Sequence, residues 1–231
     1  MVAKRKTLTV LIPALNEEKN IKKVIQSSKK IKNYDTKIIV VIDKKTTDRT
    51  AKVAKKLGAK IILGKGSGKG SNIKTSLPYL KSEFVVQIDA DYQFMPYEIP
   101  KLVSPLTQGY DIALGTRYQK GSKRQEDSVS YFRLLGSIAL SFITSIFSMQ
   151  RITDVMAGFK AFKTQVLKDL NPKTSHFGYE AELVVRGAKK GYKIINVPIT
   201  YKKRPSGKSS VSSIKDGFLV LLTIIKTFFE K

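Results

Sequence analysis

Two carboxylates, Asp89 and Asp91, stand one residue apart directly after an apolar run, in the stretch VVQIDADYQF at 85–94. Two hard oxygen ligands on one turn suit a divalent cation such as Mg2+ or Mn2+ that bridges a diphosphate. Such a cation and its phosphates would explain acids in a basic protein, because they reverse the local charge balance. The pair alone is a weak motif, since a helix cap or a solvated turn accounts for most such pairs.

The charge of the chain indicates an anionic partner. Its 43 Lys and Arg stand against 18 Asp and Glu, which gives a net charge of +25. Nucleic acid, anionic lipid headgroups and small phosphorylated substrates all fit such a field. A nucleic-acid-binding module is expected to interleave basic residues with exposed aromatics, whereas the aromatics here gather in apolar segments. We therefore predict no nucleic-acid partner.

Length and composition predict one sizeable domain. The chain has 231 residues, is 42% hydrophobic and contains no cysteine. The missing cysteine excludes disulfides, thiolate nucleophiles and cysteine zinc sites. The start, MVAKRKTLTVLIPALNEE, has a short apolar run followed by polar residues in place of a cleavage site, so we interpret it as a first strand and not a signal peptide. We expect a domain over 1–213 and a separate amphipathic helix over 214–231.

Short β-branched runs alternate with helical patterns through the first half of the chain. This alternation predicts an α/β fold, with a mainly parallel sheet and helices on both faces. In such sheets, ligands bind beyond the carboxyl ends of the strands, where Asp43, Asp89 and Asp91 stand. The predicted strands cover 7–12, 37–42, 60–63 and 83–88, and the predicted helices cover 16–31, 46–58 and a short segment ending near Leu80.

The second half of the chain has a looser pattern. We predict strands at 110–118 and 192–201 and helices at 130–149 and 178–191. The polar stretch 118–128, YQKGSKRQEDS, is expected to be a mobile surface loop.

Two apolar segments raise the question of a membrane span. No residue between Arg133 and Arg151 is charged, but a polar stripe at helical spacing favours an amphipathic helix; it consists of Ser137, Ser141, Thr144, Ser145 and Ser148. The C-terminal GFLVLLTIIKTFFEK is too short for a span and contains Lys226. It is expected to lie on a membrane surface, on the core or in a dimer interface. We predict no transmembrane segment.

Five motifs follow one another in a fixed order: PALNEE, IDKKTTDRT, GKGSNIKTSL, DADYQF and GTRY. In this order and spacing the chain, from about Thr7 to about Ser213, resembles the inverting nucleotide-sugar glycosyltransferases of the GT-A fold. Within them it is similar to the polyprenyl-phosphate sugar synthases, such as the dolichol-phosphate mannosyltransferases. The resemblance implies a Rossmann-like fold, a nucleoside diphosphate sugar as donor, a polyprenyl phosphate as acceptor, Mg2+ or Mn2+ as cofactor, and a peripheral place on the cytosolic face of a membrane.

The resemblance also implies roles for particular residues. As donor-binding residues it gives Pro13, Asn16, Glu17, Asp43, Lys69, Asp89, Arg204 and Lys208, the last two in the mobile basic loop RPSGKSS. As metal ligands it gives Asp89, Asp91 and Gln93. As catalytic residues it gives Asp91, with Arg117 and Arg133 holding the acceptor phosphate. The block DVMAGFKAF at 154–162 matches a further family motif.

Elementary chemistry supports this assignment. A departing nucleoside diphosphate needs its charge neutralised by a cation and lysines. A phosphate acceptor is already ionised, so arginines that position it suffice. An alcohol acceptor would need a general base, for which Glu180 or Glu182 is the candidate. The only histidine, His176, is expected to be a surface residue.

The chain also departs from the family pattern. The second-strand motif places Lys44 and Lys45 after Asp43, which leaves the nucleotide base open. The last loop has Ser209-Ser210 where the family usually has S-K, with Lys208 one step before this pair. Three alternatives therefore stay open beside the lipid-phosphate transferase. They are a soluble transferase acting on a small phosphorylated acid, since DADYQFMPYEIPKLVSPL and DRT also resemble glucosyl-3-phosphoglycerate synthases, a nucleic-acid-binding module, and a scaffold with a decayed transferase fold.

Overall fold

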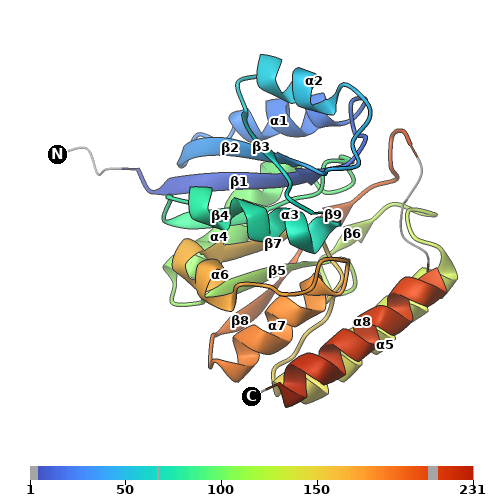
Figure 1. Ribbon diagram of the computed structural model, residues 1–231. Coiled ribbons are helices and arrows are strands. Elements are labelled where there is room, and N and C mark those ends of the chain that lie inside the picture. The colour runs from blue at the N-terminus through green and yellow to red at the C-terminus, as the bar shows by residue number, and fades with distance from the viewer. Residues whose placement is uncertain (1–4, 67, 208–212, 231) are drawn as a thin grey trace.

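The computed structural model describes residues 5–66, 68–207 and 213–230 (Figure 1). Its centre is a seven-stranded sheet in the order β3-β2-β1-β4-β7-β5-β8. The strands are β1 Thr7–Ala14, β2 Asp35–Ile42, β3 Lys60–Leu63, β4 Phe84–Gln87, β5 Ile112–Thr116, β7 Lys160–Lys163 and β8 Ile194–Pro198. All neighbouring strands are parallel except that β7 runs antiparallel to both β4 and β5. The predicted mainly parallel α/β sheet is confirmed.

Helices cover both faces of this sheet. The helices are α1 Ile21–Lys29, α2 Thr50–Lys56, α3 Lys69–Ser76, α4 Ile99–Thr107, α5 Tyr131–Ser148, α6 Thr164–Leu170, α7 Tyr179–Lys189 and α8 Ser213–Phe229, with 3-10 turns at Leu77–Tyr79 and Pro96–Glu98. A two-stranded ribbon, β6 Lys123–Arg124 with β9 Thr200–Tyr201, lies beside the sheet. The predicted loop 118–128 therefore contains a short strand.

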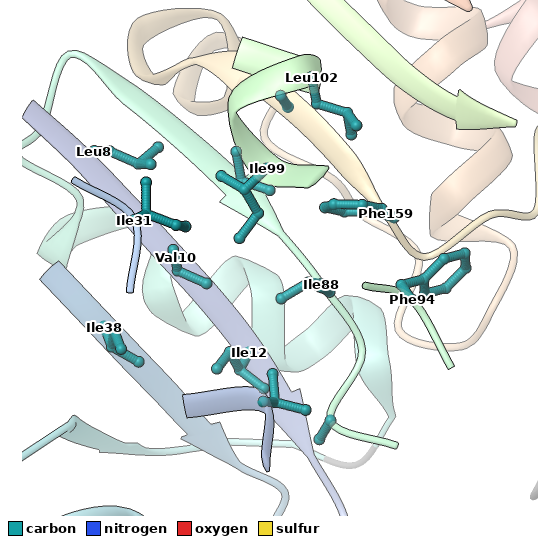
Figure 2. Packing of buried hydrophobic residues seen from close by; sticks show 14 of the residues in the cluster. Leu8, Val10, Ile12, Ile31, Ile38, Ile88, Phe94, Ile99, Leu102 and Phe159 are labelled. Atoms are coloured by element: carbon teal, nitrogen blue, oxygen red, sulfur yellow. The ribbon is translucent and has the colours of Figure 1, made fainter. Parts of the chain in front are cut away.

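The hydrophobic core has two parts, one on each face of the sheet. Residues of β1 alternate between them: Leu8, Val10 and Ile12 face α1 and α4, whereas Leu11 faces α3 and α7. Figure 2 shows the first part, with the β1 side chains between Ile38 and Ile99. Burial of each such side chain contributes about 1.5–3 kcal/mol. A strand buried on both faces has to be apolar throughout, which is why its sequence shows a continuous run.

Helix α1 and strand β7 are examples of elements that differ from the sequence predictions. Helix α1 begins at Ile21 and not at residue 16, because Asn16 has a φ of 53° and the chain turns there before the helix starts. Strand β7 was not predicted, because its four residues, KAFK, carry a lysine at each end. The structure nevertheless buries Lys160 completely.

Helices α5 and α8 pack against each other and against α7, at the edge of the molecule away from α1 and α2 (Figure 1). Helix α8 contributes Val220 and Ile224 to the second part of the core. Its status as a unit separate from 1–213 stays a prediction. Among the described residues, Tyr131–Ser148 has the length and apolarity to cross a membrane, with a mean hydropathy of 1.4.

The polar stripe of α5 lies on the protein side of the helix. Ser141, Thr144 and Ser148 are buried, and the hydroxyls of Ser141 and Thr144 donate 2.7 Å hydrogen bonds to backbone carbonyls one turn earlier. The large apolar side chains of the helix face outward instead. Helix α5 is therefore amphipathic, as predicted, but with its apolar face away from the protein.

Candidate active site

The first acid of the site, Asp43, follows β2 and is buried. Its carboxylate accepts hydrogen bonds from the backbone N–H groups of Lys45, at 2.9 Å, and Gly68, at 2.8 Å, and from the side-chain amide of Asn72, at 2.9 Å. Gly68 takes a φ of 100°, which favours glycine. Asp43 thus joins the end of β2 to the start of α3 and sets the position of Lys69.

Lys69, the first residue of α3, bridges two acids. Its ammonium lies 2.6 Å from Oδ1 of Asp89 and 2.8 Å from Oε1 of Glu180. Burial lowers the pKa of Lys69, but the charges of Asp89 and Glu180 together raise it above the ordinary value. Lys69 is therefore a fixed positive charge beside the first acid of the D-x-D pair.

Glycine 158 allows this close approach. A Cβ at Gly158 would lie 2.5 Å from both Oδ1 of Asp89 and Nζ of Lys69. No larger residue fits there without displacing the ion pair. This explains the glycine in the block DVMAGFKAF, whose part in the site could not be inferred from the motif alone.

Asp91, the second acid of the D-x-D pair that Asp89 begins, faces the loop that follows β9. Arg204 Nη1 lies 3.5 Å from Oδ2 of Asp91, and Nη2 of the same arginine donates to Glu17. Ser206 and Asn20 bond to each other twice, at 2.7 Å and 3.1 Å. The loop that follows β9 is therefore fastened to the residues before α1 and lies beside Asp91. Lys208, predicted to act with Arg204, lies outside the described residues.

The predicted metal ligands Asp89 and Asp91 lie near a third carboxylate, that of Glu17. Burial, with the adjacent charge of Asp89, raises the pKa of Asp91 to about 7, and burial also raises the pKa of Glu17. Both values are raised chiefly because burial disfavours the ionised carboxylate. The described residues contain no group of three or more His, Cys, Asp or Glu placed to hold a metal ion. Two carboxylates that leave further positions to water and substrate phosphates fit Mg2+ or Mn2+.

The other predicted donor residues shape the loops. The side-chain oxygen of Asn16 accepts a 2.8 Å hydrogen bond from the backbone N–H of Thr47, which ties the loop after β1 to the loop after β2. Pro13 is buried within β1. The amide of Gln93 donates to the carbonyl of Lys202, at 2.9 Å, and its backbone N–H donates to Asp91, at 3.1 Å. Gln93 therefore joins the D-x-D turn to the basic loop.

Arg117 is held by a residue that was not assigned a role from sequence. Asp154, which is fully buried, accepts bonds from Nε, at 2.7 Å, and Nη2, at 2.8 Å, of Arg117. The guanidinium also lies over the rings of Tyr118 and Tyr201, at 4.9 Å and 5.1 Å. Because this fork is fixed on three sides, it is pre-organised. Arg133 lies in the first turn of α5 and is half-buried.

Both candidate general bases are engaged in structural contacts. Glu180 is buried and bonded to Lys69 and Lys160. Burial would raise its pKa, but the two lysines, Lys160 first, lower it below the ordinary value. Glu182 is buried too, and it accepts 2.8 Å bonds from the backbone N–H groups of Lys173 and Thr174 and from Arg186. These acids anchor parts of the chain, and neither is placed to take a proton from an alcohol. His176 lies in the loop before α7, where its Nδ1 accepts from Gly178.

Comparison with known proteins identifies the family. Residues 9–170 match the model of glycosyl transferase family 2, and the chain belongs to this family. It is 27% identical to a dolichyl-phosphate hexose transferase of Haloferax volcanii over 97% of this chain and 95% of that protein. It is 31% identical to a dolichol-phosphate mannosyltransferase of Pyrococcus furiosus over 88% of this chain, and spans 59% of that longer protein.

A solved structure shares the fold. The chain superposes on glucosyl-3-phosphoglycerate synthase of Mycobacterium tuberculosis, in complex with Mn2+, UDP and glucosyl-3-phosphoglycerate, with a TM-score of 0.77. The match covers 96% of this chain and 80% of that chain at 22% identity. The expected GT-A fold is confirmed, and the protein is a glycosyltransferase.

Proposed function

We propose that this glycosyltransferase moves a sugar, with inversion, from a nucleoside diphosphate sugar to a polyprenyl phosphate at the cytosolic surface of a membrane. The names of the Haloferax and Pyrococcus relatives favour a dolichyl-type acceptor. In the reaction, an acceptor phosphate oxygen forms a bond to the anomeric carbon. The bond from that carbon to the diphosphate breaks, and the nucleoside diphosphate leaves with the electron pair.

The donor half of the site is built for a leaving diphosphate. A divalent cation held by Asp89 and Asp91, with the amide of Gln93 beside them, would neutralise the charge that grows on the diphosphate. Lys69 and Arg204 place two further positive charges there. Asn16, Glu17 and Asp43 hold the loops that we assign to the nucleotide, Pro13 lies near the end of the strand before them, and we assign Lys208 to the same basic loop as Arg204.

The acceptor half favours a group that is already ionised. Asp154 holds Nε and Nη2 of Arg117, and we assign the Nη1 of this arginine, together with Arg133, to the acceptor phosphate. A hydroxyl acceptor would have to lose a proton, and Glu180 and Glu182 are both occupied. An acceptor phosphate needs no such base, because it is ionised at neutral pH.

The outward apolar face of α5 and α8 is the observation that carries the lipid assignment. Phe142 is 66% exposed, Ile146 60% and Met149 93%, and on α8 Phe218 and Phe229 are exposed as well. A contiguous apolar face of this kind marks an interaction site, and an in-plane amphipathic helix buries such a face in the headgroup boundary of a bilayer. The same helix α5 carries Arg133. An acceptor in the bilayer would therefore lie on the same helix as Arg133.

An open groove of about 640 Å³ lies beside α5. Its lining includes Tyr118, the neighbour of Arg117, the α5 residues Ile138 and Phe142, and residues 149–153. Its position fits the polyprenyl chain of an acceptor whose phosphate lies at Arg117.

The alternative acceptor is a small phosphorylated acid such as 3-phosphoglycerate. It has in its favour the likeness to glucosyl-3-phosphoglycerate synthase, which at 22% identity shows the fold alone. It gives no reason for the outward apolar face of α5 and α8.

A transfer assay tests the proposal. The purified protein is supplied with Mn2+ or Mg2+, a polyprenyl phosphate in detergent and a panel of radiolabelled nucleotide sugars. We expect label to enter the organic phase with one donor, and to be lost in Asp91→Asn. If no donor labels the lipid and one is consumed with 3-phosphoglycerate, the alternative acceptor replaces the lipid. If no donor is bound at all, the assignment of a donor site fails.

A further inference from the structure

Four charged side chains form one continuous chain from the protein interior to the donor site. Lys160 on β7 is bonded to Glu180 on α7, Glu180 to Lys69 on α3, and Lys69 to Asp89 after β4. The side chains of Lys160 and Glu180 are 0% and 2% exposed, whereas those of Lys69 and Asp89 are 15% and 26% exposed. Two positive and two negative charges balance, so the group is neutral as a whole.

The inner end of this chain is rigidly held. The ammonium of Lys160 also donates to the backbone carbonyls of Val155, at 3.1 Å, and Ala157. Glu180 accepts further bonds from the hydroxyl of Tyr179, at 2.6 Å, and from the amide of Gln87, at 3.1 Å. Lys160 thus has three acceptors and Glu180 four donors, which leaves the partly exposed outer end as the part that can rearrange.

The ammonium of Lys69 is shared between two acids, and this sharing has a direct consequence for Asp89. A lysine that divides its charge between Glu180 and Asp89 holds each of them less tightly than it would hold one alone. Asp89 therefore keeps Lys69 as a counter-ion, and a cation can still bind its carboxylate in place of Lys69. Without Glu180, Lys69 would pair with Asp89 only, and the cation would compete with a stronger ion pair.

We propose that Glu180 and Lys160 are positioning residues of the donor site: they hold Lys69 at a place where it neutralises Asp89 without blocking it. Lys160 pairs with Glu180 in the interior, and Glu180 fixes one side of the Lys69 ammonium, so that Asp89 does not hold this ammonium alone. This inference rests on the proposed function, because it takes Asp89 as a cation ligand.

A purely structural role for the buried pair makes a different prediction. Removing both charges of a buried pair and replacing them with neutral side chains of similar size is often close to neutral for stability, whereas removing one leaves a buried unpaired charge. If Lys160 and Glu180 serve only the fold, the charge-balanced variant Lys160→Met/Glu180→Gln will fold and bind cations like the wild type.

The test is Mn2+ binding by the full chain, measured from the loss of the free-ion electron paramagnetic resonance signal. The proteins compared are the wild type, Lys160→Met/Glu180→Gln, Lys69→Met and the combination of all three changes. We expect the charge-balanced pair variant to bind Mn2+ about fivefold or more weakly. In the Lys69→Met background, the same two changes should alter the affinity by less than about twofold, because the residue through which they act is gone.

A matched control uses the other lysine of β7. Lys163 pairs with Asp111 at 2.8 Å, away from the acids of the donor site. Lys163→Met/Asp111→Asn removes an ion pair from the same strand and should leave Mn2+ binding unchanged. Glu180→Asp serves as a second variant: it keeps all four charges but shortens the acid, and it should weaken Mn2+ binding in the same direction if the pair variant fails to fold.

Two results would overturn the inference. One is unchanged Mn2+ affinity in the folded pair variant or in Glu180→Asp. The other is an equal loss with and without Lys69, which would show that the pair does not act through this lysine. A wild type that binds Mn2+ neither alone nor with UDP or GDP would instead remove the cation site of the proposed function, and the inference with it.

Discussion

The proposed donor site and the outer face of α5 and α8 are opposite kinds of surface. In the donor site, Asp89 is paired with Lys69, and Asp91 and Glu17 with Arg204, all within the chain. On the outer face, Phe142 and Met149 are largely exposed to solvent. The first region supplies its own counter-ions, whereas the second shows apolar area that its own chain leaves uncovered.

Under the proposed function, this difference corresponds to the half of the reaction that each region would serve. A donor arrives from solution and displaces internal ion pairs when it binds. The charges of its site can therefore be paired with one another before binding. A lipid acceptor brings its own apolar environment. The protein surface that meets it is therefore expected to expose apolar side chains in water. The burial of Ser141 and Thr144 under the exposed Phe142 and Ile146 is the clearest sign of this arrangement.

The largest expected effect is on sugar transfer and comes from a substitution in the proposed donor site. Asp91→Asn should lower kcat for sugar transfer about a hundred- to a thousandfold, because it removes a charge that serves the leaving diphosphate. Binding to vesicles should not change. Steady-state kinetics and vesicle flotation measure the two properties on one preparation. Asp127→Asn, an exposed acid paired with Lys203, is the control, and comparable losses in both variants would refute a special role for Asp91.

The next largest effect is on vesicle binding and comes from substitutions on the outer face of α5 and α8. Phe142→Ser/Ile146→Ser should weaken binding to anionic vesicles about a hundredfold, since burial of each side chain contributes about 1.5–3 kcal/mol. The free energy of unfolding should stay within about 0.5 kcal/mol of the wild type, because both positions are exposed. Flotation and chemical denaturation measure these quantities.

The matched control for this prediction is Leu63→Ser/Tyr97→Ser. Both side chains are exposed and large but lie outside α5 and α8. Their replacement should leave vesicle binding intact. Equal weakening in both double variants would mean that exposed apolar area anywhere on the molecule is enough, and the outer face would lose its special place.

A smaller effect is expected where the two regions meet. Arg117→Lys keeps the charge but loses the planar fork that Asp154 holds, and it should raise KM for the polyprenyl phosphate about tenfold. KM for the donor should not change. Arg5→Lys, at an exposed arginine before β1, is the control. If donor KM rose instead, Arg117 would belong to the donor half.

The smallest effect concerns the basic loop. Asn20→Ala removes both hydrogen bonds to Ser206, and each such bond contributes about 0.5–1.5 kcal/mol. Donor KM should therefore rise a few fold while acceptor KM stays constant. Asn33→Ala, at an exposed asparagine outside the site, serves as the comparison. An unchanged donor KM would show that the loop is not fastened through Asn20.

The sequence predicted the donor half of the molecule better than the acceptor half. Strands β1 and β2 are long apolar runs, and the acids that follow them can be placed by the general rule for parallel sheets. Strand β7 has four residues and two lysines, so its pattern resembles a surface segment. The burial of Lys160 depends on Glu180, twenty residues later, and no local signal reveals such a pairing.

The orientation of α5 could not be predicted from the sequence either. Periodicity shows that a helix has two faces but not which of them meets the protein. Ser141 and Thr144 satisfy their hydroxyls within their own helix, which allows the polar face to be buried. The bond between Arg117 and Asp154 joins residues 37 positions apart, and this contact too needed the structure.

The central claim, that the acceptor is a lipid-borne phosphate, is tested most directly by competition. One labelled nucleotide sugar is offered with vesicles containing a polyprenyl phosphate and with an equal concentration of 3-phosphoglycerate in solution. We predict that the label passes to the organic phase, and that Phe142→Ser/Ile146→Ser reduces this transfer when the lipid is in vesicles. Label that stays in a water-soluble product, unaffected by these substitutions, would contradict the claim.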